Sequence, residues 1–142
     1  MFGELIKSYL AKLKEIEGYD VKSVILFGSV ARGQAKEHSD IDIIVVASGL
    51  PELRNRDALS PFPKPARIQD IWMKPEELED MVIAKTGFLV DALLEGRVLQ
   101  DDGTVAEARE KLVASLKRLK AKRLKFGWMI PREDLRAEIS FD

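Results

Sequence analysis

Hydrophobic residues recur along the chain at two spacings, which predict helices and strands in turn. The first segment has helical spacing and is followed by Gly18 as a stop signal; its apolar residues are Leu5, Ile6, Tyr9, Leu10, Leu13 and Ile16. Two short apolar runs, at about 21–27 and 40–46, then predict buried strands, and a third run at 66–73 predicts another. Between them, the proline-rich stretch 48–65 predicts a long loop, either a lid or a plain insertion.

The second half of the chain predicts more helix than strand. Pro75 is suited to the first turn of a helix, and residues 88–95 predict another short helix that Gly96 closes. Val98-Leu99 predicts a short edge strand. From 104 to about 125 the spacing is helical again, with an apolar side of Val105, Ala108, Leu112, Leu116 and Leu119.

This order of elements predicts an α/β (α+β) fold, with a small mixed sheet of about three to five strands flanked by helices. We expect residues 1–103 to form one domain and residues 104–142 to add a basic amphipathic helix and a tail that pack on it. The apolar tail at 127–131, which contains Trp128, is either packed back on the domain or a surface for a partner.

Composition narrows the class of protein without identifying it. Hydrophobic residues make up 46% and charged residues 33% of the 142 residues, as in a globular domain with its own core. The formal net charge of −1 argues against general coating of nucleic acid, and the lack of cysteine excludes disulfides and thiol chemistry. The sequence shows no secretory signal and no apolar run long enough to span a bilayer, so we expect a cytoplasmic protein without a membrane partner.

Two aspartates open the second apolar run. Side chains alternate between the faces of a strand, so Asp40 and Asp42 are expected on one face, above Ile44 and Val46. Two like charges about 7 Å apart beside a hydrophobic wall repel each other and resist desolvation. A divalent cation would offset that cost, and Mg²⁺ suits it because it takes its other ligands from water and phosphate. By itself, such a pair is more often two solvated acids at the mouth of a strand.

The preceding strand ends in a Gly-Ser turn. Gly28 gives the backbone room to turn and a ligand room to approach, and Ser29 is suited to cap a short helical turn. Backbone N–H groups there, with the serine hydroxyl, would form an anion site, and Arg32 could pair with phosphate or with an acid. An ordinary turn with a capping serine would have the same residues.

Together, the Gly-Ser turn and the aspartate pair match a specific motif. Gly28-Ser29, the stretch 30–39 and Asp40-Ile41-Asp42 fit the pattern Gly-Ser-x10-Asp-x-Asp letter for letter. The string LFGSVARGQAKEHSDIDIIVV resembles the nucleotidyltransferase superfamily related to DNA polymerase β, and within it the small stand-alone minimal nucleotidyltransferases. The close match covers residues 24–46, and a looser likeness continues to about residue 103.

The resemblance implies a magnesium-dependent transfer of a nucleoside monophosphate, preferably AMP, from a nucleoside triphosphate to a hydroxyl acceptor. It implies that Asp40 and Asp42 bind one or two Mg²⁺ ions, and that the Gly-Ser turn grips the β- and γ-phosphates. The family uses a third carboxylate on a neighbouring strand, and this role falls to Asp70, the only acid in the strand predicted at 66–73. A shift of one residue would turn Asp70 to the other face and leave Gln69 in its place.

Larger relatives carry an extra acceptor-binding domain, and from 142 residues we expect none here. Similar minimal domains pair with a separate HEPN-type protein in toxin–antitoxin fashion and adenylylate it, so the resemblance implies a partner protein of this kind. A homo-oligomer is also compatible with the sequence. The basic side of the last helix, which includes Lys111, Lys117 and Arg118, is either a solvated face or a surface for an acidic partner or an RNA acceptor.

Two other classes of function stay open on the sequence. In the first, the chain is a catalytically weak or inactive binding module that neutralises a partner by contact, as an antitoxin does. In the second, it is a metal-dependent phosphodiesterase or nuclease. Such sites usually add histidines or further acids, and His38 is the only histidine in the chain.

Overall fold

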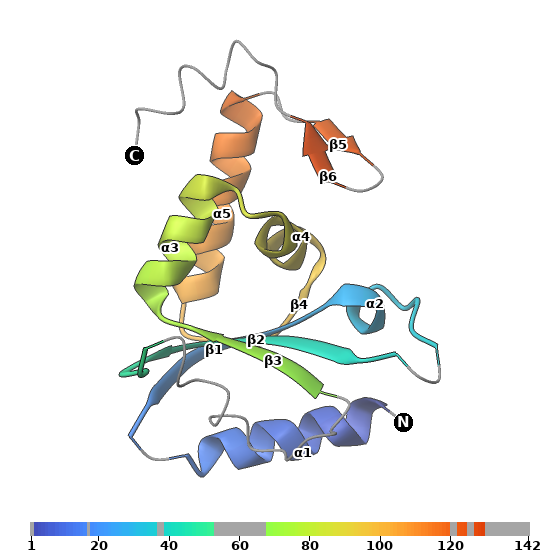
Figure 1. Ribbon diagram of the computed structural model, residues 1–142, viewed down its shortest axis with the longest axis vertical. Coiled ribbons are helices and arrows are strands. Elements are labelled where there is room, and N and C mark those ends of the chain that lie inside the picture. The colour runs from blue at the N-terminus through green and yellow to red at the C-terminus, as the bar shows by residue number, and fades with distance from the viewer. Residues whose placement is uncertain are drawn as a thin grey trace.

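A mixed β-sheet forms the centre of the protein (Figure 1). The computed structural model describes residues 2–16, 18–36, 39–52, 68–119, 122–124 and 127–129, with the last two segments as backbone only. In this part of the chain the main sheet has the strand order β3-β2-β1-β4, where the strands are β1 (Asp20–Phe27), β2 (Ile41–Ser48), β3 (Ile68–Met73) and β4 (Arg97–Asp101). β1 is antiparallel to β2 and β4, whereas β2 and β3 are parallel. The predicted fold class, a small mixed sheet with flanking helices, is confirmed.

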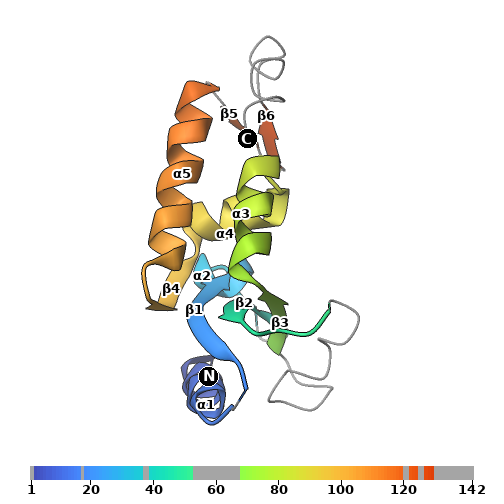
Figure 2. The ribbon, with the colours of Figure 1, turned by 90° about the vertical axis from the view of Figure 1, so that its left-hand side faces the viewer.

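Helices cover both faces of the sheet (Figures 1 and 2). One face packs against α1 (Phe2–Lys14), whose Tyr9 and Leu13 are buried there. The other face packs against α3 (Pro75–Ala84), α4 (Gly87–Glu95) and α5 (Thr104–Arg118). The sheet therefore separates two hydrophobic cores.

β2 lies between these cores and is buried on both faces. Ile41, Ile43 and Val45 join the core on the α1 side, whereas Ile44 and Val46 join the core on the three-helix side. This alternation explains why β2 reads as a continuous apolar run in the sequence. It also fixes the face of every other side chain in the strand.

Local sequence signals explain where the helices begin and end. α3 begins at Pro75, where the missing N–H of proline costs no helical hydrogen bond, and the N–H of Lys74 donates to Glu77 Oε1 at 2.7 Å. The N-cap residue of α5 is Gly103, and the carboxylate of Asp101, two residues earlier, accepts N–H groups of the first turn at 3.0 Å. The predicted apolar side of α5 is buried as expected, and it belongs to the three-helix core.

The C-terminal part differs from the prediction. The helix expected to reach about residue 125 ends at Arg118, and β5 (Lys122–Leu124) pairs with β6 (Gly127–Met129). After Leu119 the sequence continues with Lys120-Ala121-Lys122-Arg123, which supplies no large apolar side chain to bury at helical spacing. Most of the predicted loop, residues 53–65, lies outside the described part.

Within the described segments, no helix combines the length and the hydrophobicity that crossing a membrane requires.

Candidate active site

The acid pair lies at the N-terminal end of β2, the central strand next to the edge strand β3. Asp42 is opposite Phe27 in the β1–β2 ladder, and Asp40 immediately precedes the strand, which begins at Ile41. Since alternate residues share a face, Asp42 lies on the three-helix side with Ile44 and Val46. Figure 1 shows this end of β2 close to the short helix α2 (Gly28–Ala31).

The Gly-Ser turn faces the acid pair directly. Gly28 has a φ of +75°, in the left-handed region that favours glycine, and a Cβ atom added there would collide with carboxylate oxygen Oδ2 of Asp42. No other residue could occupy this position without moving either the turn or the carboxylate. The structure therefore brings together the two halves of the motif.

α2 differs in one detail from the expected turn. Phe27, rather than Ser29, is its N-cap residue, and no side-chain hydrogen bond caps it, so the expected capping role of Ser29 is wrong. Ser29 lies within the helix, and its carbonyl accepts the N–H of Gln34 at 2.9 Å. The reason is that Gly28 already adopts the tight turn out of β1, which starts the helix earlier. The serine hydroxyl is thus not committed to capping this helix.

The electrostatics of Asp42 are those of a carboxylate that a cation would stabilise. Burial raises the pKa of Asp42, the neighbouring charge of Asp40 raises that pKa further, and Arg32 lowers it in part. Gly28 meets Asp42, Asp40 lies two residues before Asp42, and Arg32 is the C-cap residue of α2. Four of the predicted site residues, Gly28, Arg32, Asp40 and Asp42, therefore lie at this end of the sheet.

Asp70 is not brought to this group. In the parallel β2–β3 ladder it pairs with Ile43, whereas Gln69 pairs with Asp42. Ile43 faces α1, and Asp70 does the same: its Oδ2 accepts the hydroxyl of Tyr9 at 2.6 Å and the indole N–H of Trp72 at 3.0 Å. The expectation that Asp70 supplies the third carboxylate is thereby corrected, because the strand register turns it to the other face of the sheet.

Gln69 occupies the place expected for that third carboxylate. Its side-chain amide donates to Asp40 Oδ2 at 2.8 Å, so it touches the acid pair directly. Nothing in the sequence alone favours Gln69 over Asp70, because residues 68, 70 and 72 and residues 69, 71 and 73 form equally plausible faces of a strand. The sequence shows only that a shift of this strand by one residue would exchange the faces of Asp70 and Gln69.

The remaining features add no further acid to the site. Among the described residues, no group of three or more His, Cys, Asp or Glu side chains is placed to hold a metal ion. His38 lies outside the described residues, and Trp128 is described only as backbone of β6. The donors available at the acid pair are two carboxylates, with Gln69 beside them.

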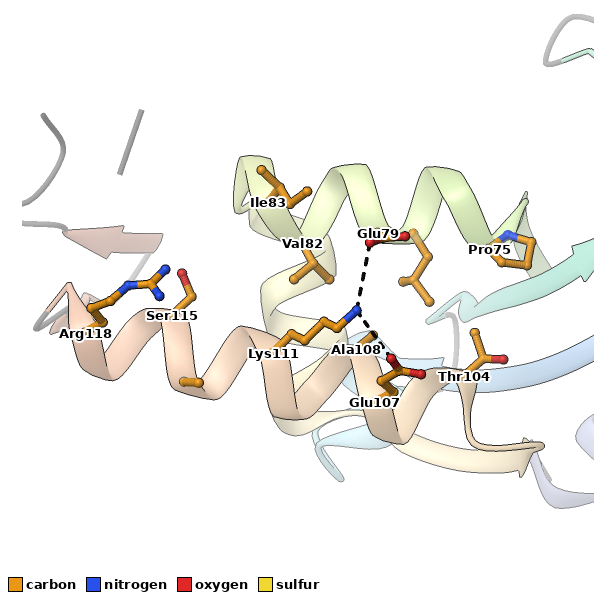
Figure 3. Close-up of a pocket in the computed structure, with 12 residues that line it drawn as sticks. Pro75, Glu79, Val82, Ile83, Thr104, Glu107, Ala108, Lys111, Ser115 and Arg118 are labelled. Atoms are coloured by element: carbon orange, nitrogen blue, oxygen red, sulfur yellow. Dashed lines mark ion pairs between the residues drawn. The ribbon is translucent and has the colours of Figure 1, made fainter. Parts of the chain in front are cut away.

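A separate cavity of about 560 Å³ lies between α3 and α5 (Figure 3). Its lining includes Val82, Ala108 and Ser115, and Lys111 forms ion pairs with Glu79 at 3.9 Å and with Glu107 at 3.4 Å. None of the predicted site residues lines this cavity. The acid pair lies instead at the N-terminal end of β2, away from the residues that line this cavity.

A mixed sheet with a Gly-Ser turn packed against an Asp-x-Asp pair defines the nucleotidyltransferase class. The model of the nucleotidyltransferase domain family matches residues 6–113, so the chain belongs to this family. The resemblance seen in the sequence is confirmed. The matched range includes β1 to β4 and most of α1 and α5.

Similar proteins occur in Methanocaldococcus jannaschii, where several relatives carry the name "putative protein adenylyltransferase". MJ1305 is 46% identical over 54 residues, which are 38% of this chain and 37% of the relative. MJ0128 is 35% identical over 95 residues, which are 66% of this chain and 78% of the relative. The chain thus spans little more than a third of the first relative's length.

A solved structure shows the same fold at low sequence identity. A mutant form of the MntA–HpeT toxin–antitoxin aligns with a TM-score of 0.50 and 17% identity, over 80% of this chain and 87% of that chain. A toxin–antitoxin structure with AMP-PNP aligns with a TM-score of 0.48 and 16% identity, over 78% of this chain and 86% of that chain.

Proposed function

We propose that this chain transfers a nucleoside monophosphate from a nucleoside triphosphate to a hydroxyl acceptor. The observation that carries the proposal is the packing of Gly28 against the Asp42 carboxylate, which leaves no room for a side chain between the turn and the acid pair. The backbone of the turn can therefore approach the phosphates of a substrate whose cation the aspartates hold. Membership of the nucleotidyltransferase family supports the same chemistry.

The acid pair suits one hard divalent cation such as Mg²⁺. Its donors are carboxylate oxygens, and burial and mutual repulsion raise the pKa of Asp42, a strain that a bound cation would relieve. When bound, the cation would neutralise phosphate charge and help to orient the triphosphate. Asp40 and Asp42 would hold it, while Gln69 would keep Asp40 in place through its amide.

The residues of the turn would bind the phosphates. The Gly28-Ser29 backbone and the Ser29 hydroxyl would donate to phosphate oxygens, and the guanidinium of Arg32 would add positive charge. In the transfer, the acceptor hydroxyl loses its proton to solvent as its oxygen forms a bond to the α-phosphorus, the α–β phosphoanhydride bond breaks, and pyrophosphate leaves. The chain's part in this step is mainly positioning and charge neutralisation.

We infer that ATP is the donor and that the acceptor is a hydroxyl of a partner protein of HEPN type. The names of the relatives in M. jannaschii support a protein acceptor and an adenylyl group. Two alternatives are that the acceptor hydroxyl belongs to a second copy of this chain in a homo-oligomer, or that it belongs to an RNA. Labelling of the acceptor separates them.

The test is to incubate the protein with α-³²P-ATP, Mg²⁺ and a host lysate and to identify the labelled molecule. We expect one labelled protein band and release of pyrophosphate, and we expect Asp42→Asn to abolish both. Asp80→Asn, on the exposed side of α3, is the matched control and should label normally. Equal labelling by wild type and Asp42→Asn would refute the proposal.

A second candidate function is a binding module that neutralises its partner by contact. The observation that favours it is Gln69, which stands where the family is expected to have an acid. The same variants separate the two: if Asp42→Asn still neutralises a co-expressed partner, contact is sufficient. If it binds the partner but no longer neutralises it, transfer is required.

A further inference from the structure

We propose that Gln69 limits this site to one divalent cation, held by Asp40 and Asp42, because it replaces the carboxylate that a second cation would need. The inference rests on the proposed function and concerns the same site. It assigns to Gln69 the role of a positioning residue that holds Asp40.

The first step is the register of β3 against β2. In the parallel ladder Asp42 is opposite Gln69, and opposite residues of neighbouring strands point to the same face. Asp70 is opposite Ile43, which is fully buried on the α1 side. The side chain next to the acid pair on β3 is thus the amide of Gln69.

The second step is that this register is firmly fixed. A slip by one residue would turn Ile68 and Trp72, which are 7% and 4% exposed, away from the α1 core. It would also separate Asp70 from the hydroxyl of Tyr9, a fully buried residue whose O–H would lose its acceptor. Asp70 therefore cannot reach the acid pair at small cost.

The third step is the charge of the site. Two ionised carboxylates balance one divalent cation, whereas two such cations would leave an excess of two positive charges, which a third acid would reduce to one. An amide is neutral, and in the observed orientation Gln69 donates its N–H to Asp40 Oδ2 at 2.8 Å rather than offering an oxygen to a cation. Gln69 therefore positions one ligand without adding a charge.

The experiment uses Mn²⁺ alone as the probe, titrated into the full chain by calorimetry without nucleotide. Gln69→Glu keeps the shape of the side chain, adds a negative charge and removes the N–H that donates to Asp40, and because Gln69 is exposed the variant should fold. Gln100→Glu makes the same change on β4, at the opposite edge of the sheet, and is the matched control.

We expect one Mn²⁺ per chain for the wild type and for Gln100→Glu. Gln69→Glu should bind a second ion, or bind the first at least about tenfold more tightly, because added ligand charge strengthens binding of hard cations. Gln69→Asp is the second variant and should shift in the same direction. Asp70→Asn should leave the stoichiometry at one.

Several results would overturn the inference: two Mn²⁺ ions or none on the wild type, no difference between Gln69→Glu and Gln100→Glu, or loss of the ion in Asp70→Asn. Its failure is distinguishable from failure of the proposed function. The cation titration contains no nucleotide or acceptor, whereas the labelling assay reports transfer. A chain that binds one Mn²⁺ as expected and labels nothing would refute only the transfer.

Discussion

At Gly28, both the backbone conformation and the surroundings depend on the absence of a side chain. Gly28→Ala would meet the Asp42 carboxylate and would also be strained at a φ of +75°. We expect nucleotidyl transfer to fall by at least about tenfold, since small displacements of reacting groups have effects of this size or more. The measurement is transfer of label from α-³²P-ATP.

Gly33 provides the control for that substitution. It also has a positive φ, of +71°, but an added Cβ would meet nothing within 4 Å. Gly33→Ala should therefore lose about 1 kcal/mol of unfolding free energy through backbone strain and retain most of the transfer activity. If both variants lose transfer equally, contact with Asp42 is not the reason that position 28 is glycine.

The residues of the acid pair could be predicted from the sequence because their arrangement is local. Asp40 and Asp42 are two apart in a buried strand, and alternation alone places them on one face. Asp70 could not be placed in this way, since its face depends on the pairing of β3 with β2. The decisive contacts, with Tyr9 and Trp72, come partly from a helix far away in the sequence.

At the scale of elements, Asp101 joins β4 to the start of α5. Its carboxylate accepts the Ser23 hydroxyl at 2.7 Å and the N–H groups of Gly103, Val105 and Ala106 at 3.0 Å. Burial alone would raise the pKa of Asp101, but the hydrogen bonds from Ser23 and from the backbone outweigh it and hold the pKa below 3.8. The ionised form is therefore the one that stabilises the fold.

We predict that Asp101→Ala lowers the free energy of unfolding by about 1–2 kcal/mol at pH 7, as is usual when a side chain that accepts N–H groups of a helix's first turn is removed. The contribution of the depressed pKa is fully present above the ordinary value of 3.8 and is lost as the pH falls through the lower folded value. Urea denaturation at pH 7 and at about pH 2.5 measures the difference. A gap between wild type and variant that widens in acid would contradict the prediction.

Most helices and strands were predictable, because apolar periodicity and the residues that start or stop a helix are local features of the sequence. Pro75, Gly96 and the buried side of α5 all mark elements close to where the structure places them. The apolar periodicity itself ends at Leu119, next to the last residue of α5, so the predicted extension to about residue 125 went beyond the pattern. Pairing of β5 with β6 replaces helix there, and pairing is not a local property.

At the scale of the whole molecule, the sheet divides the protein into a site-bearing face and a structural face. The hydrogen bond from Tyr9 to Asp70 joins α1 to β3 across 61 residues of sequence. Burial of the Tyr9 hydroxyl and the neighbouring charge of Asp70 both raise its pKa, so it stays protonated and keeps donating. Asp70, which the sequence predicted as a catalytic acid, thus attaches α1 to β3.

We predict that Tyr9→Phe lowers the free energy of unfolding by about 1.5–3 kcal/mol, the usual range for a hydrogen bond to a charged group. Chemical denaturation measures this loss. Because Tyr9 and Asp70 lie on the face away from Asp42, binding of Mn²⁺ should not change. A variant of normal stability with weakened Mn²⁺ binding would place Asp70 in the site after all.

The position of Gln69 beside Asp40 also bears on how this chain could evolve. A glutamine codon becomes a glutamate codon by a single base change, so a third acid is one mutation away on the correct side of the strand. Position 70 offers no such route, because its acid is already engaged with Tyr9 and Trp72. Laboratory selection for faster transfer should therefore recover changes at codon 69 before any at codon 70.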